Sequence, residues 1–257
     1  MYDNYKLSEI KGLLVMNFKD VDQSRVAQMY NEMDEIWPDD DKWYKYTHEY
    51  IIKYIGSFQH FKTLNKNSKI LNLGSGGNEY EITGSHYHVD IAKEKICRCK
   101  NYFVTSAEKL PFKNDFFDAG VCVGSVINYC DPFAVIHEIS RTLKKGSYFI
   151  LDFEQSESWQ FIGTQDYKSD VSLVASFNSG YNDKLWIFSL SYITNILSDF
   201  SFEIINLERF HLLSPLLYKI IHNENKAAKL SILDPLAKKN GFLKNKSYNI
   251  ILTVQKV

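Results

Sequence analysis

Three glycines after a short apolar run form the segment of this chain that is best suited to hold a ligand. Residues 69–73 are Lys-Ile-Leu-Asn-Leu, and Gly74, Gly76 and Gly77 follow them. A short apolar run of this kind is typical of a buried parallel strand. Glycine permits positive φ and removes side-chain bulk, so a ligand can lie against the backbone at the carboxyl end of the strand. The turn alone suits several nucleotide-like ligands.

Two later segments carry polar groups that narrow the class of ligand. A predicted strand over 86–90 ends in Asp90, and an acid in this position can accept both hydroxyls of a ribose. The next predicted strand is followed by Ser106, Ala107 and Glu108, where backbone amides and a polar side chain can bind the edge of an adenine. Together these residues predict a site for an adenosine-type ligand.

A nicotinamide dinucleotide is the alternative ligand, and the spacing of the glycines argues against it. The pattern Gly-x-Gly-x-x-Gly, begun at Gly74, requires glycine at position 79, where this chain has Glu79. Such a pattern also usually opens its own domain, whereas residues 1–68 precede the turn here. Another nucleotide ligand remains an open alternative.

Alternating strands and helices are expected from Lys69 to Phe153. The clearest helix covers 132–143, because Asp131 suits its N-cap and Gly146 its end. Strands are predicted at 69–73, 86–90, 101–104, 118–123 and 147–153, followed by a helix at 189–197 and strands at 202–207 and 248–254. The alternation predicts an α/β fold with a doubly wound, mostly parallel seven-stranded sheet, whose last strand is antiparallel.

Helical regions are expected on both sides of this alternating core. Residues 1–65 are predicted to form an N-terminal helical cap or lid, whose amphipathic helices are divided by an acidic turn at 37–41. These helices cover the sheet, close over the ligand, or do both. Residues 66–257 are predicted to be the ligand-binding domain, with a helical insertion at about 212–243 that is divided near Asn223.

Composition limits the partners of the protein. The chain has 257 residues and a formal net charge of −1, so no strong global field draws it to nucleic acid or to a membrane. Only four residues are arginine, the side chain that most often binds phosphate and guanine through two parallel hydrogen bonds. Charges interleaved near the N-terminus argue against a signal peptide, and no apolar run approaches the roughly 20 residues of a membrane span. We therefore expect a soluble, cytoplasmic protein.

The four cysteines give no sign of a metal site. Cys97 and Cys99 form a Cys-x-Cys pair, but neither a second pair nor a histidine cluster stands at zinc spacing. Free thiols in a reducing cytoplasm, and no bound metal, are the expectation.

The ordered set of motifs over 69–153 resembles the class I S-adenosylmethionine-dependent methyltransferases, in particular their type 11 small-molecule branch. In that branch the first strand ends in Asp-Leu-Gly-x-Gly-x-Gly. Four further motifs follow in this order: a single Asp, Asp-Ala-Glu-x-Leu-Pro-Phe, Phe-Asp, and Glu-x-x-Arg-x-Leu-Lys-Pro-Gly-Gly. The corresponding residues here are 72–77, Asp90, 106–112, 117–118 and 138–147. The resemblance implies the Rossmann-like methyltransferase fold, with S-adenosyl-L-methionine as cofactor.

The resemblance also implies which residues bind the cofactor. The glycine turn matches the segment beneath its methionine part, and the acid after the second strand matches the ribose contact. The loop after the third strand matches the adenine contact, and the segment after the fourth strand faces the transferred methyl group. The implied cofactor-binding residues are Tyr30, Asn72, Gly74, Ser75, Gly76, Asp90, Ile91, Ser106, Ala107, Glu108, Gly124 and Ser125.

Three departures from the family pattern bear on this site. Asn72 replaces an Asp that could attract the ammonium of the cofactor, and Ser106 replaces an Asp that contacts the adenine. Between Gly77 and His86 there is room for hardly one helical turn, where the family carries a full helix whose dipole serves the methionine carboxylate. That side of the site is left to the N-terminal segment, with Tyr30 as its candidate contact.

These observations predict an enzyme that transfers a methyl group to oxygen or nitrogen of a small-molecule acceptor. His48, Tyr129 and Glu154 are the candidates for a catalytic base, and a lone histidine on an aromatic helix is more often structural. One alternative is a catalytically weak or inactive cofactor-binding protein that acts as a regulatory or partner subunit. A third is an RNA methyltransferase, suggested by the lysines within 226–246 and opposed by the scarcity of arginine.

Overall fold

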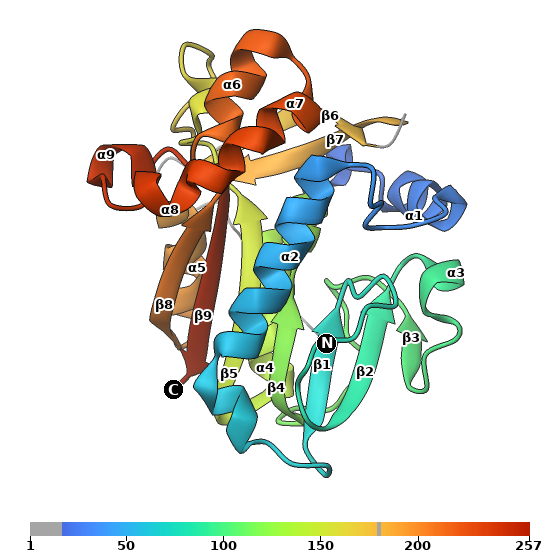
Figure 1. The fold of residues 1–257 in the computed structure, drawn as a ribbon. Coiled ribbons are helices and arrows are strands. Elements are labelled where there is room, and N and C mark those ends of the chain that lie inside the picture. Colours follow the sequence, from blue (N-terminus) through green and yellow to red (C-terminus); the bar gives the residue numbers. More distant parts are fainter. Residues whose placement is uncertain (1–16, 179–180) are drawn as a thin grey trace.

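A seven-stranded sheet runs through the centre of the structure (Figure 1), a computed structural model that describes residues 17–178 and 181–257. Its strand order is β3-β2-β1-β4-β5-β9-β8. Neighbouring strands from β3 to β5 are parallel, and β9 is antiparallel to both β5 and β8. The predicted doubly wound sheet is therefore confirmed, with its antiparallel last strand. The strands are β1 (Lys69–Leu73), β2 (Ser85–Asp90), β3 (Tyr102–Val104), β4 (Phe117–Cys122), β5 (Leu143–Glu154), β8 (Phe202–Phe210) and β9 (Asn249–Lys256).

Helix α2 (Lys42–Ser57) covers one face of the sheet, along which it runs in Figure 1. Its residues Ile51 and Ile55 are buried in one apolar cluster with Ile70 of β1 and Val121 of β4. Strands of a parallel sheet are apolar on both faces and need such cover. The second half of the predicted N-terminal cap thus shares its core with the sheet, while the division of the chain at residue 65 stays a prediction.

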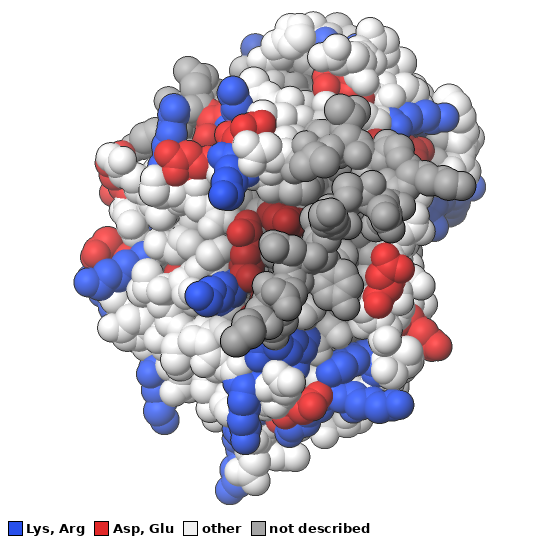
Figure 2. All heavy atoms as spheres, turned by 180° about the vertical axis from the view of Figure 1, so that it is seen from behind, with Lys and Arg blue, Asp and Glu red and all other residues white. Residues whose placement is uncertain are grey.

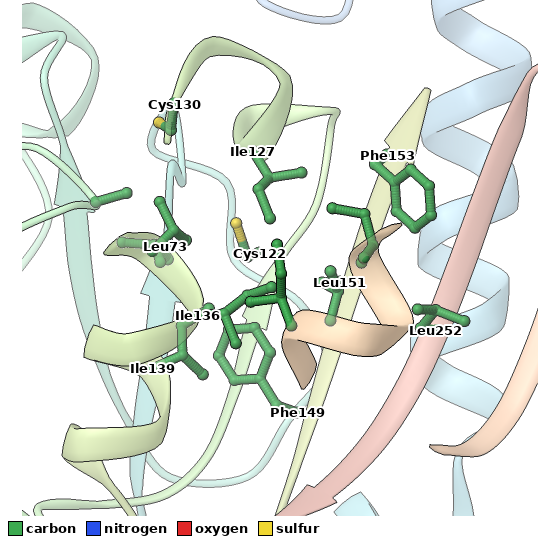
Figure 3. Close-up of a cluster of buried hydrophobic side chains, with 14 of the residues drawn as sticks. Leu73, Cys122, Ile127, Cys130, Ile136, Ile139, Phe149, Leu151, Phe153 and Leu252 are labelled. Carbon is green, nitrogen blue, oxygen red and sulfur yellow. The ribbon is translucent and has the colours of Figure 1, made fainter. Parts of the chain in front are cut away.

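Helices α4 (Pro132–Thr142) and α5 (Leu190–Asp199) bury their apolar sides in a second, larger cluster. Figure 3 shows part of it, where Ile136 and Ile139 of α4 lie close to Phe149 of β5. Ile136 and Ile139, which share helical spacing with Phe133, are buried as that spacing predicts, whereas Phe133 itself is 47% exposed.

The predicted breaks in the N-terminal region are also the observed ones. Helix α1 (Gln23–Glu32) begins after Asp22, whose carboxylate accepts hydrogen bonds from the backbone of Ser24 and Arg25. Asp41 ends the predicted acidic turn and caps α2 in the same way. An aspartate at the N-cap satisfies backbone N–H groups that the helix itself leaves unpaired.

The structure has more elements after residue 153 than the sequence predicts. A hairpin of β6 (Val171–Asn178) and β7 (Tyr181–Phe188) forms a separate two-stranded sheet that was not predicted. Its second strand ends in Leu185–Phe188, an entirely buried run that lacks the alternation of a one-sided strand. The helical insertion consists of the short helices α6 (Ser214–Ile221), α7 (Glu224–Ala227), α8 (Asp234–Ala237) and α9 (Gly241–Lys244), of which the last two were not predicted individually. Earlier in the chain, the short helix α3 (Lys93–Ile96) was also not predicted.

The predicted division of the helical insertion near Asn223 is confirmed. His222 ends α6 in the left-handed conformation with a φ of 49°, and the side chain of Asn223 accepts a hydrogen bond from the backbone of Lys226 to cap α7.

We predict opposite effects on stability for two glycine-to-alanine substitutions. A Cβ atom on Gly120 in β4 would lie 2.7 Å from Cε2 of Phe149 and 2.9 Å from the carbonyl oxygen of Leu71. Gly120→Ala should therefore lower the free energy of unfolding by about 1–3 kcal/mol. Gly56→Ala in α2, where the added atom meets nothing within 4 Å, should raise it by about 0.5–1 kcal/mol. Urea unfolding measures both changes. A Gly120→Ala variant with the same free energy of unfolding as the wild type would contradict the packing described.

Candidate active site

A large cavity lies at the carboxyl ends of β1, β2 and β4, where open α/β sheets bind their ligands. It measures about 870 Å³, counting its open mouth. Its lining includes nine of the residues predicted to bind a cofactor: Tyr30, Gly74, Ser75, Gly76, Asp90, Ile91, Ser106, Ala107 and Gly124. The other three, Asn72, Glu108 and Ser125, lie outside this lining.

The turn after β1 accepts only glycine at two positions. Gly74 and Gly76 have φ values of 64° and 53°, which residues with a side chain rarely adopt. A Cβ atom on Gly76 would also lie 2.1 Å from Cδ1 of Ile36, and one on Gly74 would lie 2.3 Å from a methyl group of Val126. The turn therefore packs tightly against Ile36 and Val126, and both glycines line the cavity together with these two side chains.

Asp90 connects this turn to the end of β2. Its Oδ2 accepts a hydrogen bond from the backbone N–H of Gly76 at 2.8 Å, and its Oδ1 accepts one from Ala92 at 2.8 Å. Burial raises the pKa of this carboxyl group, and the backbone hydrogen bonds oppose that shift. Each carboxylate oxygen can accept a second hydrogen bond, so the group still has acceptor positions for a ligand in the cavity.

The segment between β1 and β2 contains no helix, as its length predicts, and side chains hold it in place instead. The amide of Asn72, which is almost fully buried, donates a hydrogen bond to the carbonyl oxygen of Asn78 at 2.6 Å. A carboxylate could not donate this bond, so the departure from the family's aspartate has a structural reason. The ring Nδ1 of His88 lies 3.1 Å from Oγ of Ser75 and supports the turn from β2.

The loop that carries Ser106 is held from the side of α4. Arg141 donates hydrogen bonds to the carbonyl oxygens of Leu110 and Phe112, and Glu138 accepts one from the backbone N–H of Leu110 at 2.7 Å. The Glu-x-x-Arg motif thus fixes the Leu-Pro-Phe segment beyond the loop. Neither side chain lines the cavity.

Glu108 joins three elements rather than facing the cavity. Its Oε1 accepts hydrogen bonds from Nε2 of Gln23 at 2.7 Å and from the backbone N–H of Asp131 at 3.0 Å. Since Gln23 begins α1 and Asp131 caps α4, this carboxylate fixes the start of α1 beside the site.

The N-terminal segment forms one wall of the cavity, on the side where the helix after β1 is missing. Tyr30, Ile36, Trp37 and Tyr44 all line it. Of these four residues, only Tyr30 was predicted to contact the cofactor. The sequence analysis also missed Asn78 and Tyr80, because the segment that carries them shows no regular pattern.

A second chamber of about 570 Å³ adjoins the first. Five residues line both cavities: Tyr30, Trp37, Tyr44, Gly124 and Tyr129. The second chamber adds Ser125, Glu154, Glu224 and Asn249. Of the three predicted candidates for a base, Tyr129 and Glu154 therefore lie at this chamber.

Burial changes the acidity of the groups around the second chamber. Burial raises the pKa of Glu154 to about 7, although the phenol of Tyr248 donates a hydrogen bond to its Oε2 at 2.5 Å. Burial likewise raises the pKa of Glu224 to about 7 and that of Tyr129 well above its usual range. Glu154 and Glu224 are thus the two carboxyl groups at this chamber whose protonation changes near neutral pH.

His48 lines neither cavity. Its ring stacks on that of Trp37 with 4.7 Å between centroids, and burial lowers its pKa. Its observed contact is with the aromatic wall and not with the space that an acceptor would occupy.

Residues 65–151 match the family model described as a methyltransferase domain. The match falls on the segment whose ordered motifs predicted it. Residues 65–151 are therefore similar to the methyltransferase domain of that family. The cavity described above is formed mainly by this domain and closed by the segment that precedes it.

One curated relative aligns with about a third of the chain. The chain is 32% identical over 87 residues to the uncharacterised protein MJ1252 of Methanocaldococcus jannaschii, an alignment that covers 32% of this chain and 35% of that protein. It thus spans about a third of the length of this curated relative.

Two solved structures share the fold. Geranyl diphosphate C-methyltransferase from Streptomyces coelicolor A3(2) superposes with a TM-score of 0.58 and 12% identity, covering 95% of this chain and 100% of that one. The 1,6-didemethyltoxoflavin-N1-methyltransferase of Burkholderia thailandensis superposes with a TM-score of 0.55 and 12% identity, covering 96% and 93%. The Rossmann-like methyltransferase fold is confirmed.

Two further expectations concern metals and membranes. Within residues 17–178 and 181–257, no three His, Cys, Asp or Glu side chains are grouped so that they could hold a metal ion. In the same part of the chain, no helix is long and apolar enough to cross a membrane. Cys97, Cys99, Cys122 and Cys130 are free thiols.

We predict that Asp90→Asn weakens cofactor binding. An amide in place of the carboxylate presents an N–H to a backbone N–H of the turn and removes a charged acceptor from the cavity. The dissociation constant for S-adenosylhomocysteine, measured by calorimetry, should rise by about tenfold or more. Asp39→Asn, which changes an exposed carboxylate, is the matched control and should bind as the wild type does. Equal affinity in both variants would contradict the role of Asp90.

We also predict a pH-dependent effect of Glu154→Gln on stability. The pKa of Glu154 is about 7 in the folded protein and lower in the unfolded chain, so its contribution is most favourable at low pH and is lost as the pH rises through about 7. Relative to the variant, the wild type should gain stability as the pH is lowered from 8 to 5. Urea unfolding at several pH values measures this difference, and a constant difference would show that the carboxyl group titrates normally.

Proposed function

We propose that this protein transfers the methyl group of S-adenosylmethionine to oxygen or nitrogen of a small-molecule acceptor. The observation that carries the proposal is the continuity of the two cavities. The first contains the glycine turn and Asp90, and the second contains Glu154 and aromatic side chains, with Gly124 and Tyr129 lining both. A cofactor in the first cavity with its methionine end at Gly124 would face an acceptor in the second.

The donor set of the first cavity fits this cofactor. Asp90 has acceptor positions for ribose hydroxyls, and the backbone at Ser106 and Ala107 lies where an adenine edge would be bound. Gly74 and Gly76 line this cavity, so a ligand chain in it would lie beside their backbone. When bound, the cofactor supplies an activated methyl group that needs no covalent help from the protein.

The protein's own residues then position the acceptor and manage its proton. The aromatic wall of Trp37, Tyr44 and Tyr129 excludes water from the boundary between the cavities. Glu154, with a pKa of about 7, is suited to take a proton from an acceptor at neutral pH. Holding the reactants in line is the larger contribution to such a reaction.

The two solved structures named above support a small-molecule acceptor. One is described as a geranyl diphosphate C-methyltransferase and the other as a 1,6-didemethyltoxoflavin-N1-methyltransferase. Both names describe small-molecule substrates, and the second chamber here, about 570 Å³ counting its open mouth, has the size for one.

A catalytically inactive cofactor-binding protein is the second candidate, because the helix after β1 is missing. An RNA methyltransferase is the third. Figure 2 shows positive and negative side chains interspersed over the described part of one face, with lysine and arginine more frequent at its lower end. Such a mixed surface favours a small molecule over a nucleic acid.

Calorimetry with S-adenosylmethionine and S-adenosylhomocysteine tests the proposal. Both should bind with one site per chain, and turnover should appear as S-adenosylhomocysteine formed in the presence of a panel of small alcohols, phenols and amines. If neither compound binds, both the methyltransferase proposal and the alternative of an inactive cofactor-binding protein are overturned. Binding without turnover on the whole panel would favour the inactive protein.

A further inference from the structure

We propose that the second chamber binds an acceptor through a positively charged amine, which Glu154 and Glu224 hold between aromatic side chains. The inference rests on the proposed methyl transfer and names the class of acceptor. The reaction is then N-methylation of a small amine.

The charge of the chamber is the first reason. Glu154 and Glu224 both line it, and none of its described lining residues is Lys, Arg or His. The two carboxylates repel one another, and Asp41 adds to this repulsion at Glu224 while Asp152 adds to it at Glu154. A cation placed between the two glutamates would relieve the repulsion, whereas an anionic acceptor would increase it.

The aromatic walls are the second reason. Trp37, Trp43, Tyr44, Tyr129 and Tyr248 line the chamber. The faces of such rings attract ammonium groups, and the attraction strengthens where water is excluded. A chamber that combines carboxylates with aromatic rings therefore suits an amine better than a phenol.

A buried hydrogen-bond acceptor without a partner is the third and independent reason. Asn249 lines the chamber and is only 2% exposed. Its Nδ2 donates to Oγ of Ser125 at 3.4 Å, but its Oδ1 has no hydrogen-bond partner among the described residues. A buried acceptor of this kind is costly unless a ligand supplies a donor. The N–H groups of an amine are such donors.

The same arrangement provides the proton step. A bound ammonium must lose one proton before its nitrogen can react, and the carboxylate of Glu154 accepts that proton. The nitrogen lone pair then forms the new N–C bond while the C–S bond breaks, and the electron pair of the broken C–S bond remains on sulfur. The product amine leaves positively charged, and Glu154 releases its proton to water.

Calorimetry on the protein saturated with S-adenosylhomocysteine tests the proposal without relying on turnover. The probes are two matched pairs, benzylamine with benzyl alcohol and tyramine with tyrosol, at pH 7.5. At least one amine should bind about tenfold more tightly than its alcohol, a difference that charged hydrogen bonds and cation–π contacts support. Amines that bind no better than their alcohols would overturn the proposal.

Variants distinguish binding of the amine in the second chamber from general electrostatic attraction of the amine to the protein. Glu154→Gln and Glu224→Gln should each remove most of the preference for the amine while S-adenosylhomocysteine still binds. Glu203→Gln, at an exposed carboxylate of β8, should retain it. A preference that survives in both chamber variants would overturn the proposal. Failure of the wild type to bind S-adenosylhomocysteine would overturn the proposed function itself, so the two failures are distinguishable.

Discussion

The site depends on the hydrogen bond between the backbone of Gly76 and the carboxylate of Asp90. Parallel pairing of β1 with β2 brings the two strand ends together, and this bond fixes the glycine turn against them. The same carboxylate also accepts from Ala92, so one side chain sets the positions of both loops that border the cavity. Its acceptor positions are the ones that a ribose would use.

The missing helix after β1 explains several features of the structure that otherwise have no common cause. Without its N-terminus, the turn is supported by the amide of Asn72 and by the ring of His88. The space beside the turn is closed by the segment around Tyr30 and Ile36, which contacts the turn directly. That segment is itself anchored, because Glu94 donates its backbone N–H to the side chain of Asn31.

The sheet could be predicted from the sequence because it depends on local patterns, and nine of the residues predicted to bind a cofactor line one cavity. The apolar runs and the glycine turn mark their own strands and loops, and the alternation of strands and helices indicates the doubly wound sheet. The second chamber could not be predicted in this way. Glu154, Glu224 and Asn249 come from distant parts of the chain, and only the tertiary structure brings them to one chamber. A match to a family motif also does not fix what a residue does. Glu108 lies in a matching motif, but here its carboxylate accepts a hydrogen bond from Gln23 at the start of α1.

The central claim is that the cofactor lies across the glycine turn with its methionine end directed at the second chamber. A crystal structure with S-adenosylhomocysteine tests it most directly. The account predicts the ribose hydroxyls on Asp90, the adenine between Ile91 and the loop at Ser106, and the sulfur beside Gly124. A ligand that bound elsewhere, or with its sulfur directed away from Gly124 and Tyr129, would contradict it.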